Sequence, residues 1–128
     1  MAGTVDLDPW VHIVESLAER PRMFVSAVRY DVFCALVVGF GIGRDDGVFI
    51  AFTDWLADRQ VAHKNYGMPS MVLAEAGVRQ LGELGQRAEL SSDEDAAARA
   101  ALIALLREFL TESAAAARER EGGVEPEA

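Results

Sequence analysis

Residues 20–24, with the sequence Arg20-Pro21-Arg22-Met23-Phe24, lie between two stretches of helical pattern. Proline disfavours helical geometry in the residue before it, so a helix that begins at Asp8-Pro9, with Asp8 as its N-cap, is expected to end near Arg20. Met23 and Phe24 are apolar where most small helical proteins have a polar turn. We therefore expect a rigid corner whose two apolar side chains are mostly buried between the first and second helices.

Apolar residues at helical spacing continue through most of the chain. The pattern over residues 30–42 is apolar almost all round, which is typical of a central, buried helix. Four of the five residues 48–52 are β-branched or aromatic and are compatible with a strand, but the pattern continues to Arg59 and favours a helix. Ser91 and Glu94 form a capping-box signal at the start of the longest helix.

Two shorter helical patterns precede that longest helix, one starting at Pro69 and a short or frayed one within residues 77–89. The longest helix is expected to stop at Gly122-Gly123. The sequence therefore predicts an all-α fold, a compact single-domain bundle of four to five helices with a buried central helix. This domain covers residues 1–121, and a disordered acidic tail covers residues 122–128.

Composition and charge exclude several classes of function. At 128 residues and 51% hydrophobic, the chain can bury one core without metal or disulfide staples. Its formal charge of −9 argues against DNA or RNA as a partner, because phosphate binding requires clustered Lys and Arg, and it favours a basic protein partner. Cys34 is the only cysteine, and no segment has the pattern of a signal peptide or a membrane span. We therefore expect a cytoplasmic protein that binds neither nucleic acid nor membranes.

The same corner carries a resemblance to a known family. The chain has Trp10 in its first helix, the motif Arg-Pro-x-Met-aromatic at residues 20–24, a Gly39-Phe40 pair late in the apolar helix, and later helices rich in Phe, Trp and Leu. Over roughly residues 9–110 it resembles a family of small bacterial helical proteins of largely uncharacterised function. Some members look like immunity-type or toxin-neutralising proteins, so the resemblance implies a helical fold and a protein partner. The chain departs from the usual pattern at Arg22, where Gly is common, and at Phe24, where Tyr is usual.

Three patterns that suggest catalysis or cofactor binding have simpler interpretations. Residues 39–43, Gly-Phe-Gly-Ile-Gly, follow a helix rather than a strand and lack the spacing of a phosphate-binding loop. Cys34 lies in the most apolar helix and is expected to be a core residue with a raised pKa, while His12 is expected to face solvent. His63 is the only other histidine, and no metal-ligand spacing is present. We therefore expect no cofactor, no metal and no catalytic residue.

Three groups of polar residues are candidates for binding a partner. One combines donors, acceptors and an aromatic ring in an expected surface loop: His63, Lys64, Asn65 and Tyr66. Arg22, in the only local concentration of arginines, is expected to be exposed. Asp54 and Asp58 are four residues apart and share one helix face. An ordinary solvated surface is the alternative interpretation of the loop and of the two aspartates.

These residues favour a non-enzymatic protein-binding module, of an immunity or toxin-neutralising type, that acts through an acidic surface. Two alternatives stay open. One is a small enzyme or biosynthetic accessory protein with a pocket near residues 63–66. The other is a regulatory homo-oligomer whose interface is the leucine-rich helix at residues 102–110.

Overall fold

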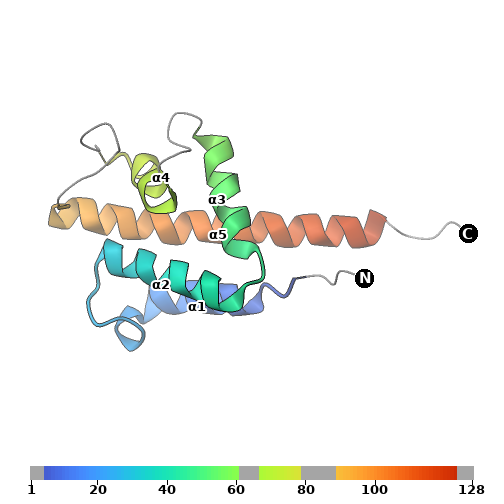
Figure 1. Ribbon diagram of the computed structural model, residues 1–128, viewed down its shortest axis with the longest axis horizontal. Helices are drawn as coiled ribbons and strands as arrows, with labels where there is room; N and C mark the ends of the chain where they lie inside the picture. The colour runs from blue at the N-terminus through green and yellow to red at the C-terminus, as the bar shows by residue number, and fades with distance from the viewer. Residues whose placement is uncertain (1–4, 61–66, 79–88, 124–128) are drawn as a thin grey trace, which may run out of the picture.

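Five α-helices and one short 3-10 helix make up the structure (Figure 1). The computed structural model describes residues 5–60, 67–78 and 89–123. Within these ranges no residue is in a β-strand, which confirms the all-α prediction. The elements follow one another as α1 (Asp8–Glu19), η1 (Pro21–Met23), α2 (Tyr30–Arg44), α3 (Val48–Arg59), α4 (Met68–Glu75) and α5 (Ser92–Gly123).

Helix α5 is the central helix of the bundle, and one face of its middle part is buried. It is 32 residues long and contacts each of the other four helices. At 1.5 Å per residue its length is about 48 Å, and Figure 1 shows its C-terminal part extending beyond the other helices. Its buried face is formed by large apolar side chains: Leu102, Ile103, Leu105, Leu106, Phe109 and Leu110. The hydrophobic core therefore lies along the middle of α5, where the other helices pack against it.

The expectation that the helix at residues 30–42 would be the central one was wrong. Helix α2 buries Phe33 and Val37 on one side, while Ala35 and Gly39 are exposed on the other and Ile42 is 72% exposed. The reason is length and position. A 15-residue helix cannot reach every neighbour, whereas α5 passes all of them. Although α2 has apolar residues on all its faces, only one face is buried.

The corner at residues 20–24 also differs from the expectation of buried side chains. Met23 is 69% exposed and Phe24 is 41% exposed. The backbone nitrogens of Phe24 and Val25 both donate to the carbonyl oxygen of Pro21, at 2.9 and 3.0 Å, which folds the segment into a tight turn outside the bundle. Val25 and Val28, just after the turn, pack against the core instead.

Helix α1 begins at the residue predicted as its cap. Asp8 is its first helical residue and Leu7 occupies the N-cap position, so Asp8 is not the N-cap. The Asp6 carboxylate accepts a hydrogen bond from the Asp8 backbone nitrogen at 3.0 Å. The helix ends at Glu19, directly before the corner, as the proline predicts.

Residues 48–52 are helical, so the strand alternative is wrong. Val48, Phe52 and Leu56 recur at four-residue spacing and are all buried. The Asp46 carboxylate accepts a hydrogen bond from the Val48 backbone nitrogen at 3.1 Å, and Gly47 supplies the positive φ of 81° that the turn requires. The chain therefore turns sharply from α2 into α3.

The last two helices start close to the predicted positions. Helix α4 begins at Met68, with Pro69 in its first turn. The capping box at the start of α5 is formed as expected, since the Ser91 nitrogen donates to Glu94 Oε1 at 2.9 Å and the Glu94 nitrogen donates to Ser91 Oγ at 3.1 Å. Helix α5 ends at Gly123, two residues beyond the predicted domain boundary. Residues 124–128 of the predicted tail and residues 79–88 lie outside the described residues.

Candidate functional site

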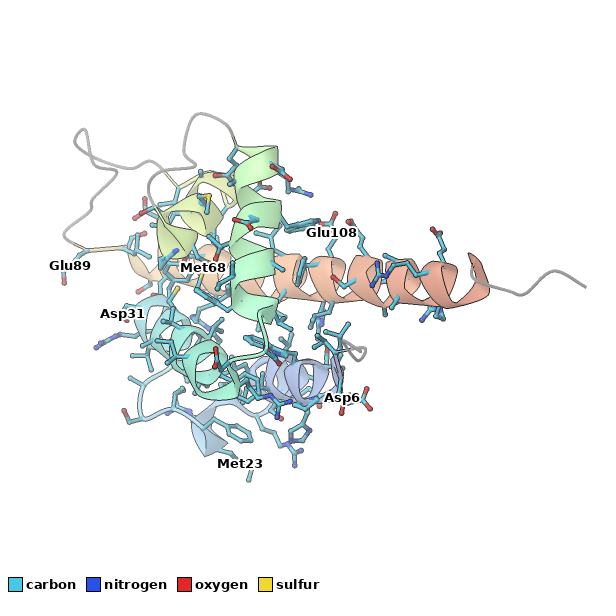
Figure 2. The ribbon with its side chains drawn as sticks, turned by 45° about the vertical axis from the view of Figure 1, so that its right-hand side comes forward. Asp6, Met23, Asp31, Met68, Glu89 and Glu108 are labelled. Carbon is cyan, nitrogen blue, oxygen red and sulfur yellow. The ribbon has the colours of Figure 1, made fainter. Side chains whose placement is uncertain are left out.

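The structure places the predicted binding residues in separate parts of the molecule. Asp54 and Asp58 are both exposed on α3, and Arg22 is exposed in η1. Figures 1 and 2 show the corner, which Met23 marks, at one edge of the molecule beyond α1 and α2, and α3 toward the opposite edge. The predicted loop of His63, Lys64, Asn65 and Tyr66 lies outside the described residues. Among the described residues, Arg22 and the two aspartates therefore do not form one site.

The outer face of α3, defined here by Ile50, Ala51, Asp54 and Asp58, is the first candidate surface. All four residues are exposed, and Ile50 is 67% exposed. The spacing of four residues between Ile50, Asp54 and Asp58 aligns them in one row. Neither aspartate forms an ion pair with another described residue. This row therefore presents two uncompensated negative charges beside an exposed apolar side chain.

The opposite side of α3 is held firmly against α4 and α5. Arg59 donates to Glu75 and to Glu108, each at 3.2 Å, and its guanidinium lies 4.8 Å from the centre of the Trp55 ring. Trp55 Nε1 donates to Glu112 at 3.1 Å. The hydrogen bond from Gln60, together with Arg59, lowers the pKa of Glu75, so this carboxylate is ionised at neutral pH. These contacts fix the orientation of the outer face.

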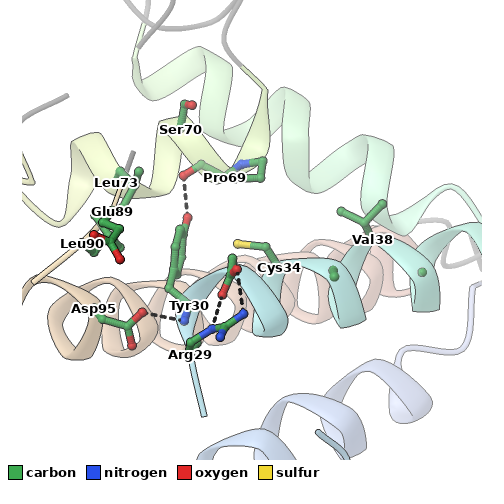
Figure 3. A pocket seen from close by; sticks show the side chains of 13 residues that line it. Arg29, Tyr30, Cys34, Val38, Pro69, Ser70, Leu73, Glu89, Leu90 and Asp95 are labelled. Carbon is green, nitrogen blue, oxygen red and sulfur yellow. Dashed lines mark hydrogen bonds and ion pairs between the residues drawn. The ribbon is translucent and has the colours of Figure 1, made fainter. Parts of the chain in front are cut away.

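A groove of about 990 Å³ between α2, α4 and the start of α5 is the second candidate (Figure 3). The residues that line it include Tyr30, Cys34, Leu73 and Asp95. Sequence reasoning missed this groove, because its walls come from three helices distant in the chain. Its volume is in the range of small-molecule sites, so its polar groups decide what it can do.

Four of the polar residues that line the groove, Arg29, Tyr30, Asp31 and Asp95, are engaged with other described residues. Tyr30 Oη donates to the carbonyl oxygen of Pro69, and the Tyr30 backbone nitrogen donates to Asp95 at 2.8 Å (Figure 3). The Arg29 guanidinium donates to both carboxylate oxygens of Asp31, at 3.0 and 3.2 Å. The two bonds of Tyr30 tie α2 to α4 and α5, while the pair between Arg29 and Asp31 is local to the start of α2.

Cys34 has the properties expected of a core residue. It is buried, and burial raises the pKa of its thiol to about 11. Burial also raises the pKa of the neighbouring Tyr30. His12 is exposed on α1, as expected, and His63 lies outside the described residues. At neutral pH Cys34 is therefore a protonated thiol, and no described histidine activates it.

The glycines at residues 39–43 have a packing role within α2. A Cβ atom at Gly41 would lie 2.6 Å from Phe49 Cβ and 3.4 Å from the Trp10 ring, so only glycine permits this close approach of α2 to α3 and α1. Gly39 and Gly43 meet no atom within 4 Å. Close helix packing, the simpler interpretation of this run, therefore holds at Gly41, whereas the unwinding expected after it does not occur, because α2 stays helical to Arg44.

Two further properties of the described residues bear on the kind of site. Across residues 5–60, 67–78 and 89–123, no three His, Cys, Asp or Glu side chains are grouped as ligands of a metal ion would be. None of the described helices combines the length and apolar content needed to cross a bilayer.

Sequence reasoning identified the two aspartates but missed the exposed apolar residues. Ile50 precedes Asp54 by four residues, so the same spacing that aligned Asp54 with Asp58 also placed Ile50 on the exposed row. Nothing in the sequence indicated that Met23 and Phe24 would be exposed. Comparisons of the chain with protein-family models, with curated proteins and with solved structures found no match.

Proposed function

We propose that the protein is a non-enzymatic binding module that recognises a basic surface of a protein partner through the outer face of α3. One observation carries the proposal. Two aspartates that form no ion pair with any described residue, and an isoleucine that is 67% exposed, lie in one row on a helix whose other side is held against α4 and α5. An apolar side chain bordered by polar or charged residues matches the arrangement of a protein–protein interface, which has an apolar centre and a polar rim.

The physical role of each group follows from its position. Asp54 and Asp58, together with the net charge of −9 on the chain, attract a basic protein and speed its association with this surface. Ile50 contributes to affinity when a partner removes its side chain from water. Because contacts of Arg59 and Trp55 already fix α3, little conformational freedom is lost when the partner binds.

An immunity or toxin-neutralising role is the form of this function that we favour. Its support is the acidic balance of the chain, which suits inhibition of a basic protein, and the resemblance of residues 20–24 to the helical family described above. The engaged polar groups of the groove, and the protonated thiol of Cys34, support a binding role rather than a catalytic one.

The experiment is capture of partners from an extract of the source organism, with the bound proteins identified by mass spectrometry. The double variant Asp54→Asn, Asp58→Asn is compared with wild type and with the control Glu19→Gln, Glu119→Gln. The control removes two exposed charges away from α3. We expect a basic partner whose association slows about three- to tenfold in the α3 variant and slows again as salt is raised. A partner that binds both variants equally well and is indifferent to salt would contradict the proposal.

A further inference from the structure

The corner at residues 20–24 has the opposite character to the outer face of α3. Met23 and Phe24 are exposed there beside the exposed residues Arg20 and Arg22. Among the described residues neither arginine has an ion-pair partner, whereas Arg59, for example, is held by two glutamates. In a chain with a charge of −9 the corner is therefore a local basic and apolar surface.

The backbone of the corner is fixed rather than loose. The Met23 nitrogen donates to the Arg20 carbonyl oxygen at 3.1 Å, and the Phe24 and Val25 nitrogens donate to that of Pro21. Proline also restricts the backbone at its own position. A surface held in this way loses little conformational entropy when it is covered, which favours its use in binding.

The two surfaces are complementary in charge and both carry exposed apolar side chains. One consists of Arg20 and Arg22 with Met23 and Phe24, and the other of Asp54 and Asp58 with Ile50. None of these four charged residues forms an ion pair within the part of the chain that the structure describes. The two surfaces lie toward opposite edges of the molecule, so a single chain cannot bring them together (Figures 1 and 2). We infer that the outer face of α3 also binds the corner of a second copy of this chain. The inference rests on the binding role proposed for the α3 face and adds a second partner, the locally basic corner of an identical chain, to the basic protein proposed above.

Such a contact joins copies head to tail. After one such contact, one copy keeps an unused corner and the other keeps an unused α3 face, so the assembly continues or closes into a ring. Two chains of charge −9 repel each other at long range. At physiological ionic strength the Debye length is about 8 Å, so this repulsion is screened while charges in direct contact still attract. Association is therefore expected at physiological salt and at high protein concentration.

The experiment is sedimentation of the full chain at physiological ionic strength, over a wide range of protein concentration up to millimolar. We expect the average mass to rise above the 13.9 kDa of one chain as concentration increases. Two variants reverse one charge on each surface, Arg22→Glu at the corner and Asp58→Arg on α3. Both sites are exposed, and circular dichroism verifies that the variants fold. Each variant alone is expected to associate at least about tenfold more weakly than wild type, because like charges then meet.

The decisive sample is an equimolar mixture of the two variants. Its association is expected to recover, because the α3 face of the Arg22→Glu variant is intact and meets the intact corner of the Asp58→Arg variant. The controls Arg118→Glu and Glu119→Arg make the same charge changes at exposed positions of α5 and are expected to associate like wild type.

Three results would overturn the inference: a wild-type mass that stays at 13.9 kDa throughout, a mixture that associates no better than either variant, or controls that weaken association equally. The proposed function is judged separately. If the chain stays monomeric while Asp54→Asn, Asp58→Asn still weakens capture of a basic protein, then the second copy is not a partner and the α3 face keeps its role. If that variant also leaves capture unchanged, both proposals fail.

Discussion

Asp95 at the start of α5 accepts a hydrogen bond from the backbone nitrogen of Tyr30, at 2.8 Å, and so caps the first turn of α2 from another helix. No side chain at the N-cap position of α2 provides this bond. The Asp95 carboxylate also accepts a hydrogen bond from Arg99 Nε at 2.7 Å. The Asp95 carboxylate thus joins α5 to α2 through Tyr30, a residue 65 positions away in the chain.

Loss of this contact is expected to destabilise the fold. The substitution Asp95→Ala leaves the first turn of α2 without its acceptor, and we expect the free energy of unfolding to fall by about 1–2 kcal/mol. Urea denaturation followed by circular dichroism measures the change. The control Asp93→Ala removes an exposed carboxylate from the same turn of α5 and is expected to cost less than about 1 kcal/mol. Equal losses in the two variants would show that Asp95 does not act as a cap.

The exposure of the corner predicts a large difference between two methionines. Met23 is 69% exposed and Met71 is fully buried. We expect Met23→Ala to change the free energy of unfolding by less than about 0.5 kcal/mol and Met71→Ala to lower it by about 2–5 kcal/mol. Thermal or urea unfolding of both variants tests this. A loss of several kcal/mol for Met23→Ala would mean that the corner belongs to the core after all.

Cys34 is expected to impose a pH dependence on stability at alkaline pH. Below its ordinary pKa of 9.0 the thiol is protonated in both the folded and the unfolded chain, so it does not make the free energy of unfolding depend on pH. As the pH rises from about 9 to about 11, the unfolded thiol ionises and the folded one does not, so stability is lost over this window. We expect wild type to lose up to about 1.4 kcal/mol per pH unit there relative to Cys34→Ala. Parallel stability curves for the two proteins, or rapid labelling of native Cys34 at neutral pH, would contradict its burial.

Two glycines of the same helix predict effects of opposite sign. At Gly41 an added Cβ meets Phe49 at 2.6 Å, so Gly41→Ala is expected to lower the free energy of unfolding by about 1–3 kcal/mol. At Gly39 an added Cβ meets open space, so Gly39→Ala is expected to raise it by about 0.5–1 kcal/mol through helix propensity alone. The two urea midpoints, compared with wild type, measure both effects. A gain for both variants would show that α2 and α3 are not in close contact at Gly41.

The features that the sequence predicted well depend on neighbours in the chain. The helix over residues 48–59, the cap formed by Ser91 and Glu94, and the shared face of Asp54 and Asp58 each follow from spacings of three or four residues. Such patterns show which residues share a helix face but not what that face meets.

The features that it missed depend on contacts between distant elements. Packing between helices determines that α2 is buried on only one side and that α5 lies among the other helices. Sequence periodicity does not show which helices pack together. Met23 and Phe24 are exposed because the hydrogen bonds to Pro21 fold the corner outward, and composition predicted the reverse. The groove beside Tyr30 needs three helices at once, so no local pattern could indicate it.

The position of α5 has a consequence for how the chain acquires its fold. Helices α1 to α4 each pack on α5, and the bidentate pair between Arg107 and Glu15 spans 92 residues. The apolar faces that α1 to α4 turn toward α5 stay uncovered until α5 has been synthesised. The core therefore cannot close while only the earlier helices are present, and contacts between distant parts of the chain must form before the fold is complete.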